Sequence, residues 1–252
     1  MSAFETLIYQ KKNGIAYITL NRPQVLNAYN VQMRDDLYEV LRAIRDDGEV
    51  RVVIFIGAGK KAFCAGADLS EFLTAPSPIV ARQVRWARDV WGLFLSIPQP
   101  LIAALHGYVL GSGLEIALCC DIRIASVDAQ FGLPEVGLGI IPAAGGTQTL
   151  PRVIGRGKAL EMLLTSRRLG AEEAFQFGLV NQVVPKGKLL EKAEEMAQKI
   201  ASYHPLAVRN AKRAVVRGLD LPLSEGLDLE RRLASELGWL ARQGVHMKQG
   251  AG

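Results

Sequence analysis

Four short apolar runs recur along the first half of the chain, and segments with helical periodicity separate them. The runs cover residues 15–20, 51–56, 101–107 and 121–125. Runs of this length suit strands that are buried on both faces, and an alternation of strands with helices builds a parallel sheet. We therefore predict an α/β fold with a parallel sheet at its centre.

The segment between the first two runs has the clearest helical signature. Asn30 supplies an N-cap before a helix predicted over residues 31–45. Its apolar residues recur at the spacing that forms one buried stripe, namely at Leu37, Val40, Leu41 and Ile44. The opposite face is expected to be exposed to solvent, and it carries Arg34, Asp35, Asp36 and Arg42.

The rest of the chain is mostly helical in pattern, with one glycine-rich interruption. Residues 132–146 combine many glycines with two prolines, which is typical of a shaped loop. A short strand is predicted over 180–184, and helices are predicted over 79–97, 113–120, 156–165, 171–177, 187–202, 205–217 and 222–242. We expect residues 1–200 to form the main core and residues 201–252 a helical C-terminal region.

Composition excludes several classes of protein. The first residues, MSAFETLIYQKK, have no charged-then-apolar signal pattern, and no apolar run approaches the ~20 residues that cross a bilayer. We expect a cytoplasmic protein without membrane contact. Two of the three cysteines are adjacent, which argues against a disulfide framework and favours reduced thiols. The net charge of +5 weakly favours anionic partners.

Two glutamates occur where a carboxylate needs a physical reason to be present. Glu115 lies among apolar residues in LGSGLEIALCC, and Glu135 lies among glycines in QFGLPEVGLG. A charge in such surroundings costs several kcal/mol unless it is paired or protonated. The simpler interpretations are a carboxylate stabilised by the start of a helix for Glu115 and a solvated loop carboxylate for Glu135.

A third element, FCAGADL at residues 63–69, has small side chains that would let a ligand approach main-chain N–H groups closely. The simpler interpretation is a tight connection between a strand and a helix. Acid–base carboxylates combined with accessible main-chain donors favour chemistry that passes through an anion.

Several ordered motifs together resemble the crotonase family, also called the enoyl-CoA hydratase and isomerase family. They are NRPQVLNA at 21–28, FCAGADL at 63–69 and the stretches 103–125, 130–152 and 164–184, and the resemblance spans roughly residues 4 to 240. It implies an α/β fold built as a crotonase-like spiral of ββα units with a helical C-terminal trimerisation region. It also implies an acyl-CoA thioester substrate, no cofactor beyond the CoA moiety of that substrate, and a homotrimer or a dimer of trimers.

The same resemblance assigns roles to individual residues. The main-chain N–H groups of Ala67 and Ser112 would form an oxyanion hole, while Glu115 and Glu135 would hold a water molecule and move its protons. Which glutamate is the acid and which the base stays open, because coupled carboxylates titrate as a pair. Retention of Glu115 favours hydration of a 2-enoyl-CoA over double-bond isomerisation. The residues expected to contact substrate or CoA are Arg22, Val25, Asn27, Ala28, Ala65, Gly66, Asp68, Leu69, Gly111 and Ala143.

The sequence departs from the family pattern at three places. Ser112 stands where the family usually has glycine, so its Cβ restricts the backbone and narrows the pocket. Ala143 stands where hydratases often have glycine, which adds a methyl group near the expected water. The C-terminus is shorter than usual, and in the family that segment commonly helps to cover the CoA adenine.

Other functions are conceivable from single features. Ser112 between glycines is reminiscent of a hydrolase nucleophile, but LGSGLE lacks the G-x-S-x-G pattern, and His106, His204 and His246 are expected to be one buried strand-end residue and two surface residues. GLGIIPAAGG fails as a dinucleotide site, and no cluster of residues supports a metal. Within the family, an isomerase and a cyclic dienoyl-CoA hydratase remain alternatives.

A non-enzymatic alternative is RNA binding, because one crotonase relative binds RNA. A basic helix face could serve it, formed by Arg209, Lys212, Arg213 and Arg217. A solvated helix is the simpler interpretation of these charges, so nucleic acid is not the expected partner. Trp86 and Trp91, in the predicted helix 79–97, could line an acyl pocket or simply pack in the core.

Overall fold

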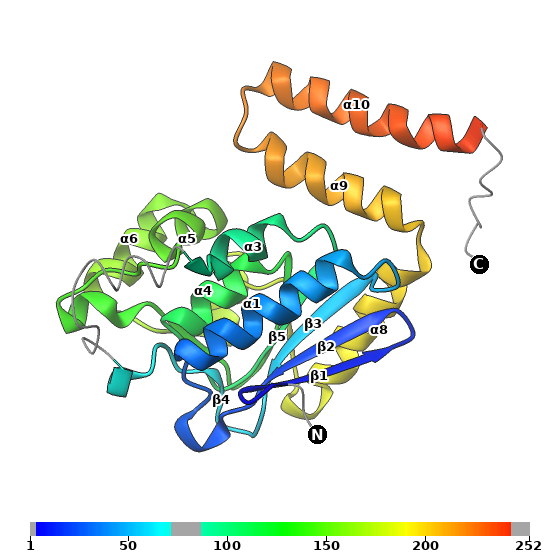
Figure 1. Cartoon of the computed structure of the whole chain (residues 1–252). Helices are drawn as coiled ribbons and strands as arrows, with labels where there is room; N and C mark the ends of the chain where they lie inside the picture. The colour runs from blue at the N-terminus through cyan, green and yellow to red at the C-terminus, as the bar shows by residue number, and fades with distance from the viewer. Residues whose placement is uncertain (1–3, 72–86, 243–252) are drawn as a thin grey trace.

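A computed structural model of the chain describes residues 4–71 and 87–242. A six-stranded sheet forms its centre, with the strand order β1-β2-β3-β5-β7-β10 (Figure 1). Its strands are β1 (Leu7–Lys12), β2 (Ile15–Leu20), β3 (Val52–Gly57), β5 (Leu101–Leu105), β7 (Ile122–Ser126) and β10 (Gln182–Val184). Strand β1 pairs with β2 in antiparallel fashion, whereas the other neighbours are parallel.

A second sheet has the order β4-β6-β8-β9. Its strands are β4 (Ala62–Cys64), β6 (Tyr108–Leu110), β8 (Gln130–Gly132) and β9 (Leu169–Gly170). The first three are parallel, and β9 is antiparallel to β8. Each of β4, β6 and β8 follows directly on a strand of the large sheet, namely β3, β5 and β7. The chain therefore makes repeated ββα turns, and the expected spiral fold is confirmed.

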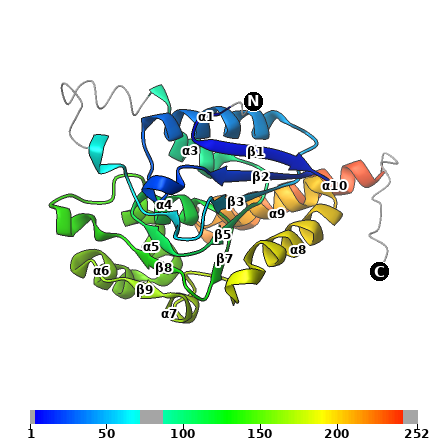
Figure 2. The same ribbon diagram turned by 90° about the horizontal axis from the view of Figure 1, so that it is seen from below.

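Helices cover both faces of the large sheet. They are α1 (Val31–Asp46), α3 (Val90–Ser96), α4 (Ser112–Cys119), α5 (Gly146–Ile154), α6 (Arg156–Thr165), α7 (Ala171–Gln176), α8 (Leu189–Ser202), α9 (Pro205–Gly218) and α10 (Leu223–Arg242), with short 3-10 turns η1 (Pro23–Val25), η2 (Leu69–Glu71), η3 (Pro134–Leu138) and η4 (Lys186–Lys188). Figure 2 shows α1 and α8 on opposite sides of the sheet. Alternate strand residues follow this division: Ile54 and Ile102 pack with α8, whereas Val53 and Phe55 pack in the larger core with α1 and α4.

Most predicted elements agree with the structure to within a few residues. The predicted strands 15–20, 51–56, 101–107, 121–125 and 180–184 correspond to β2, β3, β5, β7 and β10, and the predicted helices after residue 97 correspond to α4 and α6 to α10. Of the predicted helix 79–97, residues 90–96 are helical, and residues 72–86 lie outside the described part of the chain, as do residues 243–252. The structure adds β1, the small-sheet strands and α5, which the sequence patterns did not predict.

The prediction that Asp36 on α1 is exposed to solvent is wrong. This residue is only 6% exposed. Its Oδ2 accepts hydrogen bonds from the main-chain N–H of Thr6 at 2.8 Å and from the Thr6 hydroxyl at 2.7 Å. A buried carboxylate is tolerated when such donors replace water. Asn30 caps the helix as predicted, because its side chain accepts from the Met33 N–H.

Helices α9 and α10 pack on each other and lie apart from the strands of the large sheet (Figure 1). The division into a core and a helical region near residue 200 stays a prediction.

In the part of the chain that the structure describes, no helix has the length and apolar character needed to cross a membrane. All three cysteines are free and buried, as expected for reduced thiols.

Candidate active site

The ends of the three parallel strands in the small sheet carry the predicted catalytic groups. Ala67 follows β4, Ser112 and Glu115 follow β6 at the start of α4, and Glu135 follows β8 within η3. Parallel strands end at the same edge of a sheet, so three successive turns of the spiral bring these groups together. All four residues line one cavity of about 320 Å³.

The orientation of the Ala67 N–H follows from two hydrogen bonds to Tyr29. The Tyr29 N–H donates to the Gly66 carbonyl at 2.9 Å, and the Asp68 N–H donates to the Tyr29 carbonyl at 2.8 Å. In a trans peptide the carbonyl and the following N–H point in opposite directions. The Ala67 N–H therefore points away from Tyr29, and Ala67 is exposed at the cavity wall.

The Ser112 N–H is available because Ser112 is the first residue of α4. The first N–H groups of a helix have no partner within the helix. Gly111 precedes it with φ 50° and ψ −125°, a conformation that favours glycine. One residue further on, a Cβ on Gly113 would lie 2.2 Å from the Cys64 carbonyl oxygen. Only glycine at position 113 lets the start of α4 pack directly on the end of β4. The residues just before the two predicted donors also lie close together, since a Cβ on Gly111 would be 3.4 Å from the Gly66 Cα.

Glu115 is buried, with 3% of its surface exposed. Its Oε1 accepts hydrogen bonds from the main-chain N–H groups of Ala144 and Gly146, each at 2.9 Å. Two main-chain donors stabilise the ionised form of a carboxylate. Glu115 does lie in the first turn of α4, as the simpler interpretation expects, but it is buried rather than exposed to solvent. The sequence did not identify Ala144 and Gly146 as the partners of Glu115, although both belong to the glycine-rich segment 132–146 that the sequence analysis interpreted as a shaped loop.

Glu135 has a contrasting environment. It is half-buried, and its Oε2 is enclosed without a hydrogen-bond partner among the described residues. Burial raises the pKa of Glu135 to about 7, and the negative charge of Glu115 adds to this rise. Near neutral pH the Glu135 carboxyl therefore exists in both protonation states. A Cβ on Gly111 would lie 3.0 Å from Glu135 Oε1, so glycine also makes room for this side chain.

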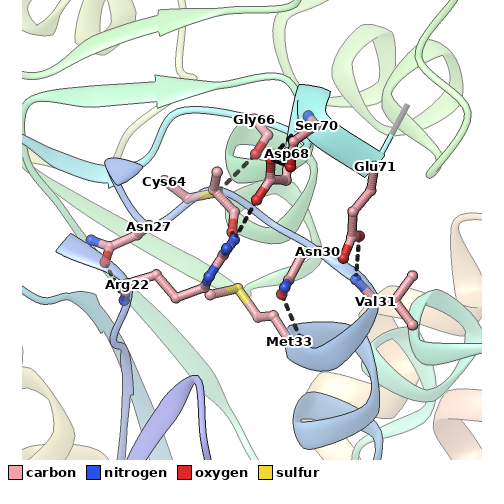
Figure 3. A network of polar contacts seen from close by, with 11 residues as sticks. Arg22, Asn27, Asn30, Val31, Met33, Cys64, Gly66, Asp68, Ser70 and Glu71 are labelled. Atoms are coloured by element: carbon pink, nitrogen blue, oxygen red, sulfur yellow. Dashed lines mark hydrogen bonds and ion pairs between the residues drawn. The ribbon is translucent and has the colours of Figure 1, made fainter. Parts of the chain in front are cut away.

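A polar network holds the loop that carries Ala67 (Figure 3). Arg22 Nη1 donates to the Ala28 carbonyl at 2.6 Å and to Asp68 Oδ2 at 2.9 Å. Asp68 Oδ1 accepts from the main-chain N–H of Ser70 at 3.1 Å and from its hydroxyl at 2.7 Å. The bonds from Ser70 and from Arg22 hold the pKa of Asp68 below its usual range.

The residues predicted to contact CoA divide into two groups. Asp68 and Ala143 line the same cavity as the predicted catalytic groups. The remaining ones do not line it, namely Arg22, Val25, Asn27, Ala28, Ala65, Gly66, Leu69 and Gly111. The Asn27 side chain is fully buried and donates to the carbonyls of Ala58 and Ala62, each at 2.9 Å. Asn27 also borders a second cavity of about 330 Å³, whose lining includes Lys60 and Lys61.

Aromatic side chains form part of the wall of the first cavity. Tyr29 and Trp91 both line it, and their ring centroids lie 5.6 Å apart. Trp91 in turn stacks on Phe94 at 6.2 Å. Tyr29 was not among the residues singled out from the sequence, whereas Trp91 was named as a pocket candidate; Trp86 lies outside the described residues.

Comparison with known proteins decides the family. The family model described as enoyl-CoA hydratase/isomerase matches residues 10–248. The chain belongs to the enoyl-CoA hydratase/isomerase family. The resemblance stated from the sequence motifs is thus confirmed, as is the expectation, at the level of the family, of an enzyme of the hydratase type.

Members of the family from several bacteria are similar over nearly their whole length. The chain is 42% identical to the short-chain-enoyl-CoA hydratase of Clostridium acetobutylicum over 231 residues, which cover 91% of this chain and 88% of that protein. It is also 42% identical to the (E)-benzylidenesuccinyl-CoA hydratase of Thauera aromatica over 217 residues, 85% of this chain and 84% of that one. The crystal structure of enoyl-CoA hydratase from Bacillus anthracis superposes with a TM-score of 0.88 at 40% identity, covering 97% of this chain and 98% of that chain.

The structure also shows the histidines considered for a hydrolase site and the residues that could bind a metal. His106 is buried at the end of β5 as predicted, His204 is half-buried rather than exposed, and His246 lies outside the described residues. Among the residues that the structure describes, no three His, Cys, Asp or Glu side chains are grouped to hold a metal ion.

Proposed function

We propose that this protein hydrates 2-enoyl-CoA thioesters to 3-hydroxyacyl-CoA. One observation carries the proposal: two carboxylates in unlike environments and two main-chain donors line the same cavity. The family membership supports the acyl-CoA class of substrate. The hydratase names of the similar proteins favour addition of water over movement of the double bond.

The main-chain donors act on the thioester oxygen. When water adds at Cβ, the electron pair of the C=C bond moves towards the carbonyl, and the thioester becomes an enolate. The N–H groups of Ala67 and Ser112 then face an oxygen whose negative charge grows during the reaction. Fixed donors of this kind stabilise the transition state more than the ground state, and loss of one typically costs ~2.7–4 kcal/mol.

We assign different roles to the two glutamates on the basis of their unlike environments. Glu115, held as a carboxylate by Ala144 and Gly146, accepts a proton from water while the water oxygen bonds to Cβ. Glu135, with a pKa of about 7, supplies the proton that bonds to Cα as the enolate collapses. After product release, exchange with solvent returns a proton to Glu135 and removes one from Glu115. Both proton transfers use side chains of the protein, so the scheme uses no cofactor beyond the CoA moiety.

The CoA nucleotide needs cationic partners for its phosphates. Lys60 and Lys61 border the second cavity, beside the segment predicted to contact CoA. We assign these lysines to the phosphates, because point charges on flexible stems suit such groups. A weaker affinity for CoA in Lys60→Ala and Lys61→Ala, measured by titration with CoA, would support the assignment.

An oligomer is the expected state. Val215, Leu219 and Leu223 on the α9–α10 hairpin are 63%, 82% and 80% exposed in the single chain. Apolar residues this exposed are typical of an interface between subunits. A homotrimer or a dimer of trimers would cover them, and light scattering on the purified protein distinguishes these states from a monomer. A cytoplasmic location stays a prediction.

The activity is tested by following the loss of absorbance of the conjugated thioester in crotonyl-CoA. Wild-type protein should hydrate it, and Glu135→Gln should not. A variant that keeps the wild-type rate would refute the assignment of Glu135. Steeply salt-dependent RNA binding without hydration of any enoyl-CoA would instead support the non-enzymatic alternative.

A further inference from the structure

Arg22 lies outside the cavity that holds the catalytic groups, yet it is bonded to the peptide chain that ends at the Ala67 N–H. We propose that Arg22 is a positioning residue that aims and polarises this N–H through two intervening peptide groups. The inference rests on the proposed function, in which Ala67 donates to the thioester oxygen. It assigns to Arg22 a role in stabilising the enolate instead of a direct contact with CoA.

The first peptide group joins Ala28 to Tyr29. Arg22 Nη1 donates to its carbonyl at 2.6 Å. The N–H at the other end of the same peptide belongs to Tyr29, and it donates to the Gly66 carbonyl at 2.9 Å. A cationic donor on one end of a peptide therefore strengthens the hydrogen bond made by its other end.

The second peptide group joins Gly66 to Ala67. Its carbonyl is the acceptor of the Tyr29 N–H, and its own N–H is the proposed oxyanion donor. The complete path runs from the Arg22 guanidinium through Ala28–Tyr29 and Gly66–Ala67 to the substrate oxygen. All dipoles along this path point the same way, with their positive ends towards the developing negative charge.

Asp68 keeps the path rigid. Its carboxylate binds Arg22 at 2.9 Å, and its main-chain N–H binds the Tyr29 carbonyl at 2.8 Å. The Arg22 and Asp68 side chains are only 18% and 15% exposed. Gly66 has φ 112°, in the region that glycine adopts readily and other residues rarely, and glycine itself places little restriction on the orientation of its peptide groups. The direction of the Ala67 N–H therefore depends on the contacts around the peptide more than on the backbone itself.

The test compares Arg22→Met, which keeps much of the side-chain stem, with Arg22→Lys, which keeps the charge. We expect Arg22→Met to lower kcat for crotonyl-CoA by ~10–100-fold and to change KM by less than ~3-fold. The loss in kcat is smaller than the ~10²–10³-fold typical for loss of a whole donor, because the Ala67 N–H itself remains. Arg22→Lys should recover part of this loss. Arg45→Met is the matched control, because Arg45 forms an exposed ion pair with Asp46 on α1.

A spectroscopic measurement separates positioning from loss of folding. Butyryl-CoA labelled with ¹³C at the thioester carbonyl binds without reacting, and its infrared C=O band shifts to lower frequency when donors polarise it. The shift should be smaller in Arg22→Met than in the wild type and partly restored in Arg22→Lys, with thermal unfolding of each variant recorded alongside.

Two results would overturn the inference. An unchanged carbonyl band and kcat in folded Arg22→Met would show that the path carries no polarisation. A KM increase of more than ~10-fold at unchanged kcat would show instead that Arg22 binds CoA directly. Absence of hydration by the wild type would count against the proposed function alone, because the band shift of bound butyryl-CoA is measured independently of turnover.

Discussion

Replacing Glu135 by glutamine should make the protein more stable at alkaline pH while removing its activity. The reason is the raised pKa of Glu135, about 7 against an ordinary value of 4.5. A group whose pKa is higher in the folded than in the unfolded state contributes stability below its unfolded pKa. That stability is lost as the pH rises through the folded pKa. Ionised Glu135 thus opposes folding above pH 7, and glutamine avoids this cost.

The magnitude follows from the interval between the two pKa values. At ~1.4 kcal/mol per pH unit, the interval from 4.5 to about 7 corresponds to about 3.5 kcal/mol for a fully enclosed group. Glu135 is only half-buried, so solvent screening reduces the expected gain to about 1–2 kcal/mol. For a chain of 252 residues this raises Tm by about 2–4 °C.

The assay is thermal unfolding of wild type and Glu135→Gln between pH 5 and pH 8.5 at one protein concentration. The difference in Tm should be small at pH 5 and should grow to its full value above pH 7, while kcat falls by ~10²–10⁴-fold. Glu5→Gln, at an exposed position that precedes β1 and lies in no helix, serves as the control and should change neither quantity. A Tm difference that does not depend on pH would refute the argument from burial.

Three further substitutions test other parts of the site. Glu115→Gln should lower kcat for crotonyl-CoA by ~10²–10⁴-fold, because the amide cannot accept a proton from water; activity near that of the wild type would contradict the assigned base. Gly113→Ala should lower the free energy of unfolding by about 2–4 kcal/mol, because its methyl group would lie 2.2 Å from the Cys64 carbonyl oxygen. Denaturant titration measures this loss. Gly157→Ala is the control: its methyl group would meet no atom within 4 Å, so its free energy of unfolding should not fall. Ser112→Gly should keep kcat within ~3-fold of the wild type, because the donor belongs to the main chain; a larger loss would show that the hydroxyl or Cβ takes part.

Elements with strong local patterns were predictable from the sequence. β2 and α1 combine apolar periodicity with clear end signals, and Asn30 caps α1 as expected. Strands β6 and β8 have three residues each, which is too short to show a period of two. β1 is an edge strand whose last residues, Gln10 to Lys12, are polar and exposed, so it does not resemble a buried strand. α5 was missed because Pro151 lies inside it and glycines precede it.

The unusual surroundings of the two glutamates were predictable from the sequence, and the contacts that they make were much less so. The apolar and glycine-rich surroundings of Glu115 and Glu135 indicated unusual carboxylates. Their different environments depend on Ala144 and Gly146, which are about thirty residues from Glu115 in the chain. Asp36 shows the same limit, since its donor Thr6 is also thirty residues away. Contacts between such distant segments follow from the spiral arrangement of the chain, which local patterns do not specify.

The side-by-side order of β4, β6 and β8 in the small sheet has an evolutionary consequence. In the proposed mechanism each turn of the spiral contributes a different group: the first two supply the main-chain donors to the thioester oxygen, the second also carries Glu115, and the third carries Glu135. On that proposal, a change in the segment after β8 would replace the proton donor and leave the main-chain donors after β4 and β6 in place. Substitutions confined to one ββα turn would then change the reaction of the thioester, while the other turns keep their structure and their part in binding.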